Sequence, residues 1–189
     1  TYHYKSFMCA LMTNNIGSVN SMMKYIMECK KNKIDVFIPN INISKKQFVY
    51  DEKGLYYPLI GINNIGEVVV NELLMERDKN GLFKNYDDFV SRTNNILNKK
   101  QFTNLVHAGA LDCFNHSRKS MVNMYETVLQ KMNYIKTLGS SIINTEFDDE
   151  EYNFDEISLW EKESLGFNLK YSSFSRFVSL KEKYNCVDL

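Results

Sequence analysis

Residues 60–77 combine a tight turn with the start of an amphipathic helix, and the turn runs through Asn63, Asn64 and Gly66. Glycine adopts backbone angles that other residues avoid, and it has no side chain to block a close approach. The first N–H groups of a helix have no intrahelical partner, and the helix dipole gives them partial positive charge. We therefore predict that a phosphate oxygen can be received by the backbone of Asn63, Asn64, Ile65, Gly66 and Glu67.

A second turn of the same kind occurs in residues 107–111, which read His-Ala-Gly-Ala-Leu between two predicted helices. Two such turns in tandem indicate paired helix-hairpin-helix units, which hold the nucleic-acid backbone without reading base sequence. This second part of the predicted site consists of Lys99, Lys100, Ala108, Gly109, Ala110, Arg118 and Lys119. Plainer interpretations are also open, because Gly109 fits a helix C-cap and the lysines fit a solvated surface.

The formal net charge is zero over 189 residues, so the overall charge favours neither nucleic acid nor a membrane surface. The charges are unevenly placed along the chain. Basic residues outnumber acidic ones in 1–53 and in 84–136, whereas residues 146–163 are strongly acidic. We interpret this pattern as a basic helical body that meets an anionic partner, followed by an acidic linker; ordinary solvated faces are the alternative.

The cysteine and histidine spacings predict no metal site. The cysteines are scattered without a Cys-x-x-Cys pair, which fits reduced thiols: Cys9, Cys29, Cys113 and Cys186. The histidines lack the spacing of zinc ligands and are expected at the surface or at caps: His3, His107 and His116. The sequence contains no apolar run of membrane-spanning length and no signal-peptide pattern. The chain starts at Thr1 rather than at Met, which we interpret as the sign of an excised fragment.

The periodicity of apolar residues predicts a mainly α-helical chain. In the first helix, Phe7, Met8, Leu11 and Met12 are expected to face inward. Asn98 is a predicted N-cap, and Gly81 and Gly166 are predicted to end helices. Helices are expected over residues 1–13, 17–33, 66–78, 98–108, 117–136 and 157–170, with a short one around Tyr86, Phe89 and Val90.

A small β element is expected beside the first helices. Residues 34–38 alternate and are β-branched, and the segments 47–50 and 55–57 flank a turn in which Gly54 would supply a positive φ. Residues 139–156 are polar and acidic with little periodicity, and we predict that they form a linker.

Five ordered segments are more specific together than any one of them alone: residues 2–12, 25–44, 62–67, 98–112 and 161–167. They resemble, in the same order, stretches of the alpha subunit of bacterial DNA polymerase III. The family stretches read His-Tyr-Pro-x-x-Phe-Met-Ala-Ala-Leu-Leu, then Tyr-Ile-x-Glu-Cys-Arg with Pro-Asp-Val-Asn-x-Ser, then Ile-Lys-x-Val-Gly-Glu. The fourth, Asn-Lys-Arg…Leu-Ile-x-Ala-Gly-Ala-Phe-Asp, is the most specific, and Glu-Lys-Glu-x-Leu-Gly-Phe follows it.

The resemblance implies a helical fingers subdomain with a small β-hairpin element, followed by a tandem helix-hairpin-helix region. Residues 1–57 would be the C-terminal part of the fingers, 58–136 the DNA-binding region, 137–156 the acidic linker and 157–189 the start of the next domain. In this family these parts hold primer-template duplex behind the active site. The palm carboxylates that bind Mg²⁺ would lie earlier in the parent DNA-directed DNA polymerase. The fragment itself is therefore expected to contain no catalytic residue and no cofactor.

The partners implied by the resemblance are double-stranded primer-template DNA and the rest of the alpha subunit, in the cytoplasm and away from membranes. The chain departs from the family pattern at Asn40, Pro58 and Asn63, where Asp, Gly and Lys are common, so a weaker grip of the first turn on phosphate is expected. Residues 130–160 hold no recognisable clamp-binding peptide. Contact with a sliding clamp or clamp loader would use a divergent segment such as 142–147, or lie outside this chain.

Two other functions can be weighed from the sequence. A helical module that docks on replisome proteins is motivated by the acidic stretch 146–163 and by Trp160 and Phe167, although a solvated linker and a core helix also explain them. An independent hydrolase is disfavoured, because the acids of residues 148–151 stand in a low-complexity stretch of the kind that is usually solvated.

Overall fold

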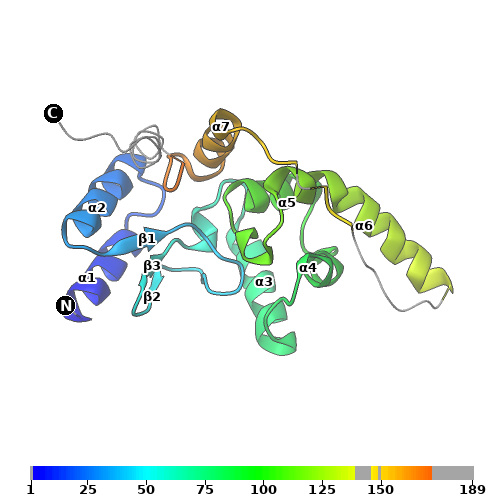
Figure 1. The fold of residues 1–189 in the computed structure, drawn as a ribbon. Helices are drawn as coiled ribbons and strands as arrows, with labels where there is room; N and C mark the ends of the chain where they lie inside the picture. The colour runs from blue at the N-terminus through cyan, green and yellow to red at the C-terminus, as the bar shows by residue number, and fades with distance from the viewer. Residues whose placement is uncertain (1, 139–145, 149, 172–189) are drawn as a thin grey trace.

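The computed structural model describes residues 2–138, 146–148 and 150–171, which form helices beside one small sheet (Figure 1). The helices are α1 (Tyr2–Thr13), α2 (Val19–Lys31), α3 (Glu67–Asn80), α4 (Tyr86–Thr93), α5 (Lys99–His107), α6 (Arg118–Leu138) and α7 (Phe154–Leu165). The strands are β1 (Asp35–Phe37), β2 (Val49–Tyr50) and β3 (Gly54–Tyr56), and the 3-10 turns are η1 (Leu59–Gly61) and η2 (Asp112–Phe114). The predicted mainly α fold with a small β element is confirmed. The expectations for residues 142–145, for Cys186 and for the end of the chain after residue 171 lie outside the described residues.

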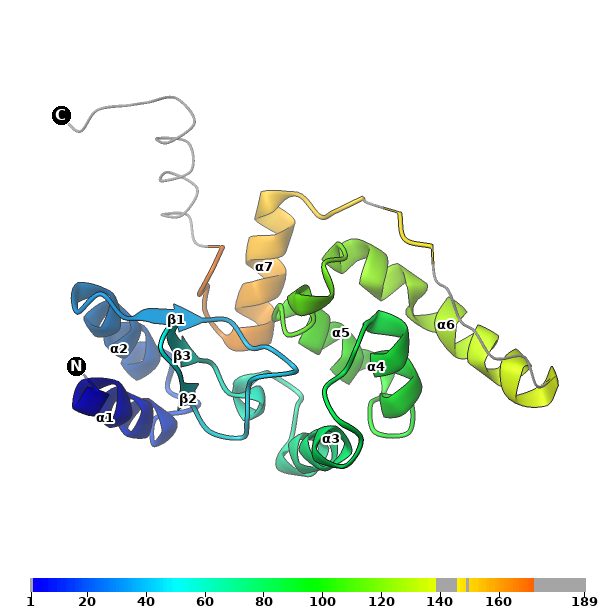
Figure 2. The ribbon, with the colours of Figure 1, turned by 60° about the horizontal axis from the view of Figure 1, so that its bottom comes forward.

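α1 and α2 pack against each other and against the sheet at one end of the molecule (Figures 1 and 2). Met8, Cys9 and Met12 are buried and define the inner face of α1. Phe7 is 59% exposed, so the prediction that it faces inward is wrong. The reason is the helical repeat, which places Phe7 on the side of α1 opposite to Met8, Cys9 and Met12.

The sheet has the order β1-β3-β2, with β3 parallel to β1 and antiparallel to β2. Gly54 pairs with Asp35, and a β-carbon at Gly54 would lie 2.3 Å from the Asp35 carbonyl oxygen. Gly54 is thus needed for the close approach of two strands, and the predicted positive φ is wrong. The preceding turn is instead closed by the Asp51 carboxylate, which accepts hydrogen bonds from the N–H groups of Lys53 and Gly54.

Helices α3 to α6 form the other part of the molecule around an aromatic core. The rings of Phe102 and Tyr125 stack with centroids 4.0 Å apart, which fastens α5 to α6, and the buried Tyr86 lies edge-on to Phe102. α6 extends well beyond α4 and α5 in both views (Figures 1 and 2). The buried face of α6 runs from Met121 through Tyr125 and Val128 to Met132, so its contacts with the core continue past the middle of the helix.

α7 lies between the sheet and α5, near the middle of the molecule (Figure 2). It begins at Phe154, three residues before the predicted start, because Asn153 and Glu156 form a capping box ahead of it. It ends at Gly166, whose φ of 87° is left-handed as expected of a helix C-cap. The fully buried Glu161 carboxylate accepts N–H groups of Leu169 and Tyr171, so the chain folds back onto α7 after Gly166.

Candidate nucleic-acid interface

The first predicted turn is present between η1 and α3, but its backbone differs from the expectation. Asn64 adopts the left-handed conformation with φ 65°, whereas Gly66 is the extended N-cap of α3 with φ −80° and ψ 169°. Asparagine tolerates left-handed angles because its short polar side chain can form local hydrogen bonds. Gly66 therefore suits this turn because it has no side chain, and not because it adopts an unusual backbone angle.

The start of α3 presents unused hydrogen-bond donors at an open surface. The first intrahelical bond runs from Val70 N–H to the Gly66 carbonyl at 3.0 Å, so the three preceding helical N–H groups have no partner within the helix. Gly66 is exposed, and a β-carbon there would meet no atom within 4 Å. Glu67 forms a 2.5 Å ion pair with Lys46, and both side chains are largely exposed. An incoming anion can reach this helix start.

Asn63 is placed differently from its neighbours in the turn. Its backbone N–H donates to the Ser164 carbonyl at 2.8 Å, and its Nδ2 donates to the Glu163 carbonyl at 2.6 Å. Its own carbonyl accepts from Nδ2 of Asn104 at 2.7 Å. The donors of Asn63 are thus directed at α7. Ile65 is buried, and its N–H donates to the Ile62 carbonyl at 3.1 Å, so the phosphate-facing part of the predicted turn is reduced to Asn64, Gly66 and Glu67.

Lys99 and Lys100 occupy the first turn of α5, directly after α4 and the loop of residues 94–98. A capping box holds this start, because Asn98 accepts from the N–H of Gln101 at 2.9 Å and Gln101 accepts from the N–H of Asn98 at 3.0 Å. Lys99 lies 3.1 Å from Glu126, and with 65% and 52% of these side chains exposed the pair contributes little. The start of α5 therefore carries two exposed, positively charged side chains.

The turn at Ala108, Gly109 and Ala110 is buried and ends α5. Gly109 N–H donates to the Val106 carbonyl and Ala110 N–H to the Leu105 carbonyl, both at 2.9 Å. Gly109 has a φ of 81°, and both alanines are fully buried. The open alternative, a helix C-cap at Gly109, describes this segment, and its N–H groups already have acceptors. The expected phosphate seat at residues 108–110 is corrected accordingly.

Arg118 is a buried structural residue, with 3% of its surface exposed. Its guanidinium makes two hydrogen bonds to the Asp112 carboxylate, at 2.9 and 2.8 Å, and a third to the His107 carbonyl at 2.8 Å. These bonds tie the end of α5 to the start of α6. The expectation that Arg118 adds charge to a DNA-binding face is corrected, because its charge is neutralised inside the protein.

Lys119 lies at the start of α6, where the acidic residues of 146–148 and 150–151 contact it. Nζ of Lys119 is 2.5 Å from Glu150, a hydrogen bond that raises the pKa of the lysine. The Glu151 carboxylate accepts the N–H groups of Arg118 and Lys119, at 2.8 and 3.1 Å. Phe147 stacks on His116 with centroids 3.6 Å apart and anchors the segment. The start of α6 is therefore an anion-binding position that the chain fills with its own carboxylate.

His107 is buried and not at the surface as expected. Its ring stacks on Trp160 of α7 with centroids 4.8 Å apart, and within the described residues His107 Nε2 and Trp160 Nε1 are buried without a hydrogen-bond partner. Burial, with the nearby charge of Arg118, lowers the pKa of His107 to about 4. The stacking of α7 on α5 was not foreseen, since the sequence offered only isolated aromatic residues as a signal.

In the part of the chain that the structure describes, no group of three or more His, Cys, Asp or Glu side chains is arranged to hold a metal ion. Among the described helices, none is long and apolar enough to cross a membrane.

Comparison with known proteins supports the interpretation of this region as helix-hairpin-helix. A family model described as "Helix-hairpin-helix motif" matches residues 33–121. The chain is similar to the DNA polymerase III subunit alpha of Borreliella burgdorferi, with 32% identity over 178 residues that cover 85% of this chain and 16% of that protein. For the same subunit of Thermus aquaticus the identity is 28% over 195 residues, covering 97% of this chain and 16% of the relative. For that of Campylobacter jejuni it is 29% over 208 residues, covering 100% and 17%. The chain thus spans a small part of the length of these relatives.

Proposed function

The chain belongs to the family of DNA polymerase III alpha subunits, and on this premise we propose that it holds primer-template duplex through sequence-independent contacts to backbone phosphates. The observation that carries the proposal is the open start of α3, where N–H groups without an intrahelical acceptor follow an exposed glycine. Backbone donors of this kind recognise phosphate and carry no information about base sequence.

The start of α5 provides the complementary charge. Lys99 and Lys100 are exposed there, and the weak pair of Lys99 with Glu126 leaves both side chains able to turn toward an anion. The starts of α3 and α5 would give two separate points of contact with a duplex. This agrees with a chain whose net charge is zero.

The catalytic step of DNA synthesis is assigned to other parts of the parent polymerase. We propose that Mg²⁺ and its carboxylate ligands belong there, and that this region contributes by holding the product duplex. The proposed role in replication implies a cytoplasmic location and contact with the rest of the alpha subunit.

Docking on the sliding clamp or the clamp loader is the alternative function. Two residues motivated it, Trp160 and Phe167, and both contact other parts of this chain. The half-buried Trp160 stacks on His107, and the buried Phe167 lies edge-on to Tyr57. We therefore place DNA holding first and propose that clamp contacts use other segments.

The test is fluorescence anisotropy of a labelled primer-template duplex titrated with the full 189-residue chain over a salt series. With about 3–5 phosphates neutralised, the logarithm of the binding constant should fall against the logarithm of salt with a slope of roughly −3 to −4. In the variant Lys99→Gln/Lys100→Gln the slope should become less negative by roughly 2, because two cations are removed.

The matched control is Lys30→Gln/Lys31→Gln, which removes two adjacent exposed lysines at the end of α2. Binding with the wild-type slope is expected from this control. A slope near zero for the wild type would contradict the proposal, and an equal loss in both double variants would show that only bulk charge matters.

A further inference from the structure

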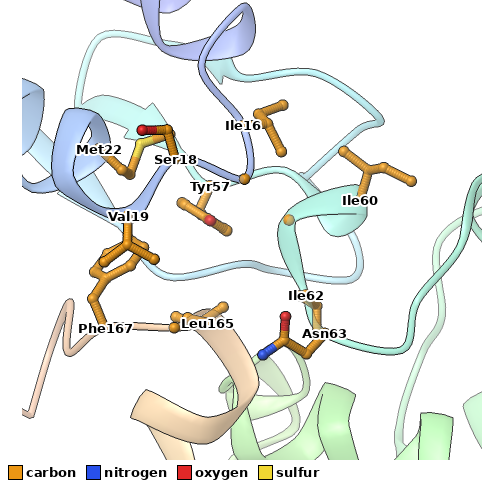
Figure 3. Close-up of a pocket in the computed structure, with 13 residues that line it drawn as sticks. Ile16, Ser18, Val19, Met22, Tyr57, Ile60, Ile62, Asn63, Leu165 and Phe167 are labelled. Carbon is orange, nitrogen blue, oxygen red and sulfur yellow. The ribbon is translucent and has the colours of Figure 1, made fainter.

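Asn63 joins the first hairpin to two other helices. All three of its hydrogen bonds leave the hairpin: two donors go to carbonyls of α7, and its carbonyl accepts from Asn104 of α5. Figure 3 shows Asn63 beside the end of α7, near Leu165, on the wall of a cavity of about 150 Å³. The residue that precedes the exposed turn is thus held from both sides.

The end of α7 is suited to receive these donors. The last carbonyls of a helix have no intrahelical donor and carry partial negative charge. Gly166 turns the chain away in a left-handed conformation, which leaves the Glu163 and Ser164 carbonyls accessible to Asn63. Leu165 and Phe167 on either side of Gly166 are buried, so the end of α7 is itself fixed.

We propose that Asn63 is a positioning residue, and that the end of α7 is a third component of the first hairpin, which holds residues 64–67 in the shape that receives phosphate. The inference rests on the proposed function. A turn that is free to leave the left-handed conformation of Asn64 loses backbone conformational entropy when DNA binding orders it. Fixing the residue before it, in the absence of DNA, removes part of that entropic cost.

The proposal differs from a direct role of Asn63 in contacting DNA. A donor that is already bonded to α7 would have to give up that bond to reach a phosphate. The two roles also differ in what Asn104→Ala should do. Asn104 bonds to the Asn63 carbonyl, so its loss should weaken binding if Asn63 must be held in place and should leave binding unchanged if Asn63 itself contacts phosphate.

The test compares Asn63→Ala, Asn104→Ala and the control Asn123→Ala in duplex binding over a salt series. Asn123 is an exposed asparagine on α6. We expect Asn63→Ala and Asn104→Ala each to weaken binding by about three- to tenfold, the effect of one hydrogen bond, with an unchanged salt slope. An affinity equal to the wild type in Asn63→Ala, or a loss in Asn63→Ala with none in Asn104→Ala, would overturn the positioning role.

Amide hydrogen exchange of Asn63 and Ile65, whose N–H groups donate to the Ser164 and Ile62 carbonyls, gives an independent readout in the DNA-free protein. Faster exchange there in Asn63→Ala, with unchanged exchange in α5 and α6, supports the role of α7 in holding the turn. Unchanged exchange in the turn overturns it. If the wild type fails to bind duplex, the proposed function is contradicted, and exchange alone still decides whether α7 positions the turn.

Discussion

Gly109 and Arg118 are in direct contact: a β-carbon at position 109 would lie 2.2 Å from Nη2 of Arg118. The glycine ends α5, and the arginine covers it while bonding to Asp112 and to the His107 carbonyl. The buried arginine therefore requires the glycine, and together they fix the angle between α5 and α6. The segment 107–111, which the sequence suggests as a phosphate-binding turn, is thus a buried connection between α5 and α6.

Replacing Gly109 with alanine should destabilise the protein. The new β-carbon would be strained at a φ of 81° and would displace the Arg118 guanidinium. Left-handed strain of about 1–2 kcal/mol and disturbed buried hydrogen bonds together predict a loss of roughly 2–4 kcal/mol in the free energy of unfolding. Urea denaturation measures this loss. The control Gly17→Ala has a φ of 95° but open space around it, so it should show the strain alone. Equal losses in both variants would mean that the Arg118 guanidinium can move away from the new β-carbon at no cost in the free energy of unfolding.

Replacing Gly66 with alanine should weaken duplex binding and leave the stability of the protein nearly unchanged. The backbone angles of Gly66 are available to any residue, and its β-carbon would meet no atom within 4 Å. The free energy of unfolding should therefore change by less than about 0.5 kcal/mol. Duplex affinity should fall by about three- to tenfold, because the methyl group would stand where the phosphate approaches. Unchanged affinity in the anisotropy assay would place the phosphate elsewhere.

The secondary structure could be predicted wherever its signals are local. Asn98 with Gln101, Gly81 after α3 and Gly166 after α7 lie within a few residues of the helix ends that they define. Those ends were predicted to within a few residues for this reason. The start of α7 lies three residues before the predicted one, because the predicted linker of residues 139–156 includes the cap formed by Asn153 and Glu156.

The site could be predicted only in part, because its decisive contacts join residues far apart in the sequence. Asn63 is bonded to Glu163, 100 residues away, and Arg118 N–H to Glu151, 33 residues away. Spacing identifies which N–H groups a helix start leaves without partners, but not which other segment then takes them. The turn around Asn64 and Gly66 and the lysines of α5 were accessible to sequence reasoning for the converse reason, since local chain geometry defines both.

His107 predicts a pH dependence of stability. Its pKa is lowered from 6.5 to about 4 on folding, so the unfolded chain binds a proton in this window that the folded chain rejects. Stability is therefore full above pH 6.5 and is lost as the pH falls toward 4. By linkage, the free energy of unfolding should drop by about 2 kcal/mol between pH 7 and pH 5 from this group alone.

Urea denaturation of the wild type and of His107→Phe at several pH values isolates this effect. Phenylalanine keeps a ring that can stack on Trp160 but does not titrate. The variant should lose the part of the pH dependence between 6.5 and 4 that the wild type shows. Parallel curves for the two proteins would mean that protonation of His107 is accommodated without disturbing α7.

The acidic segment over α6 predicts a gain of binding on mutation. Glu150 neutralises Lys119 and Glu151 occupies the first N–H groups of α6, so Glu150→Gln/Glu151→Gln should free one cation and weaken a carboxylate cap. Duplex affinity should rise by about three- to tenfold with a slope more negative by roughly 1, while the free energy of unfolding falls by about 1 kcal/mol. The control Glu28→Gln/Glu52→Gln changes the net charge equally at two exposed sites outside the acidic segment and should leave the slope unchanged. If both double variants gain affinity alike, the effect is one of overall charge, and Lys119 has no specific part in binding.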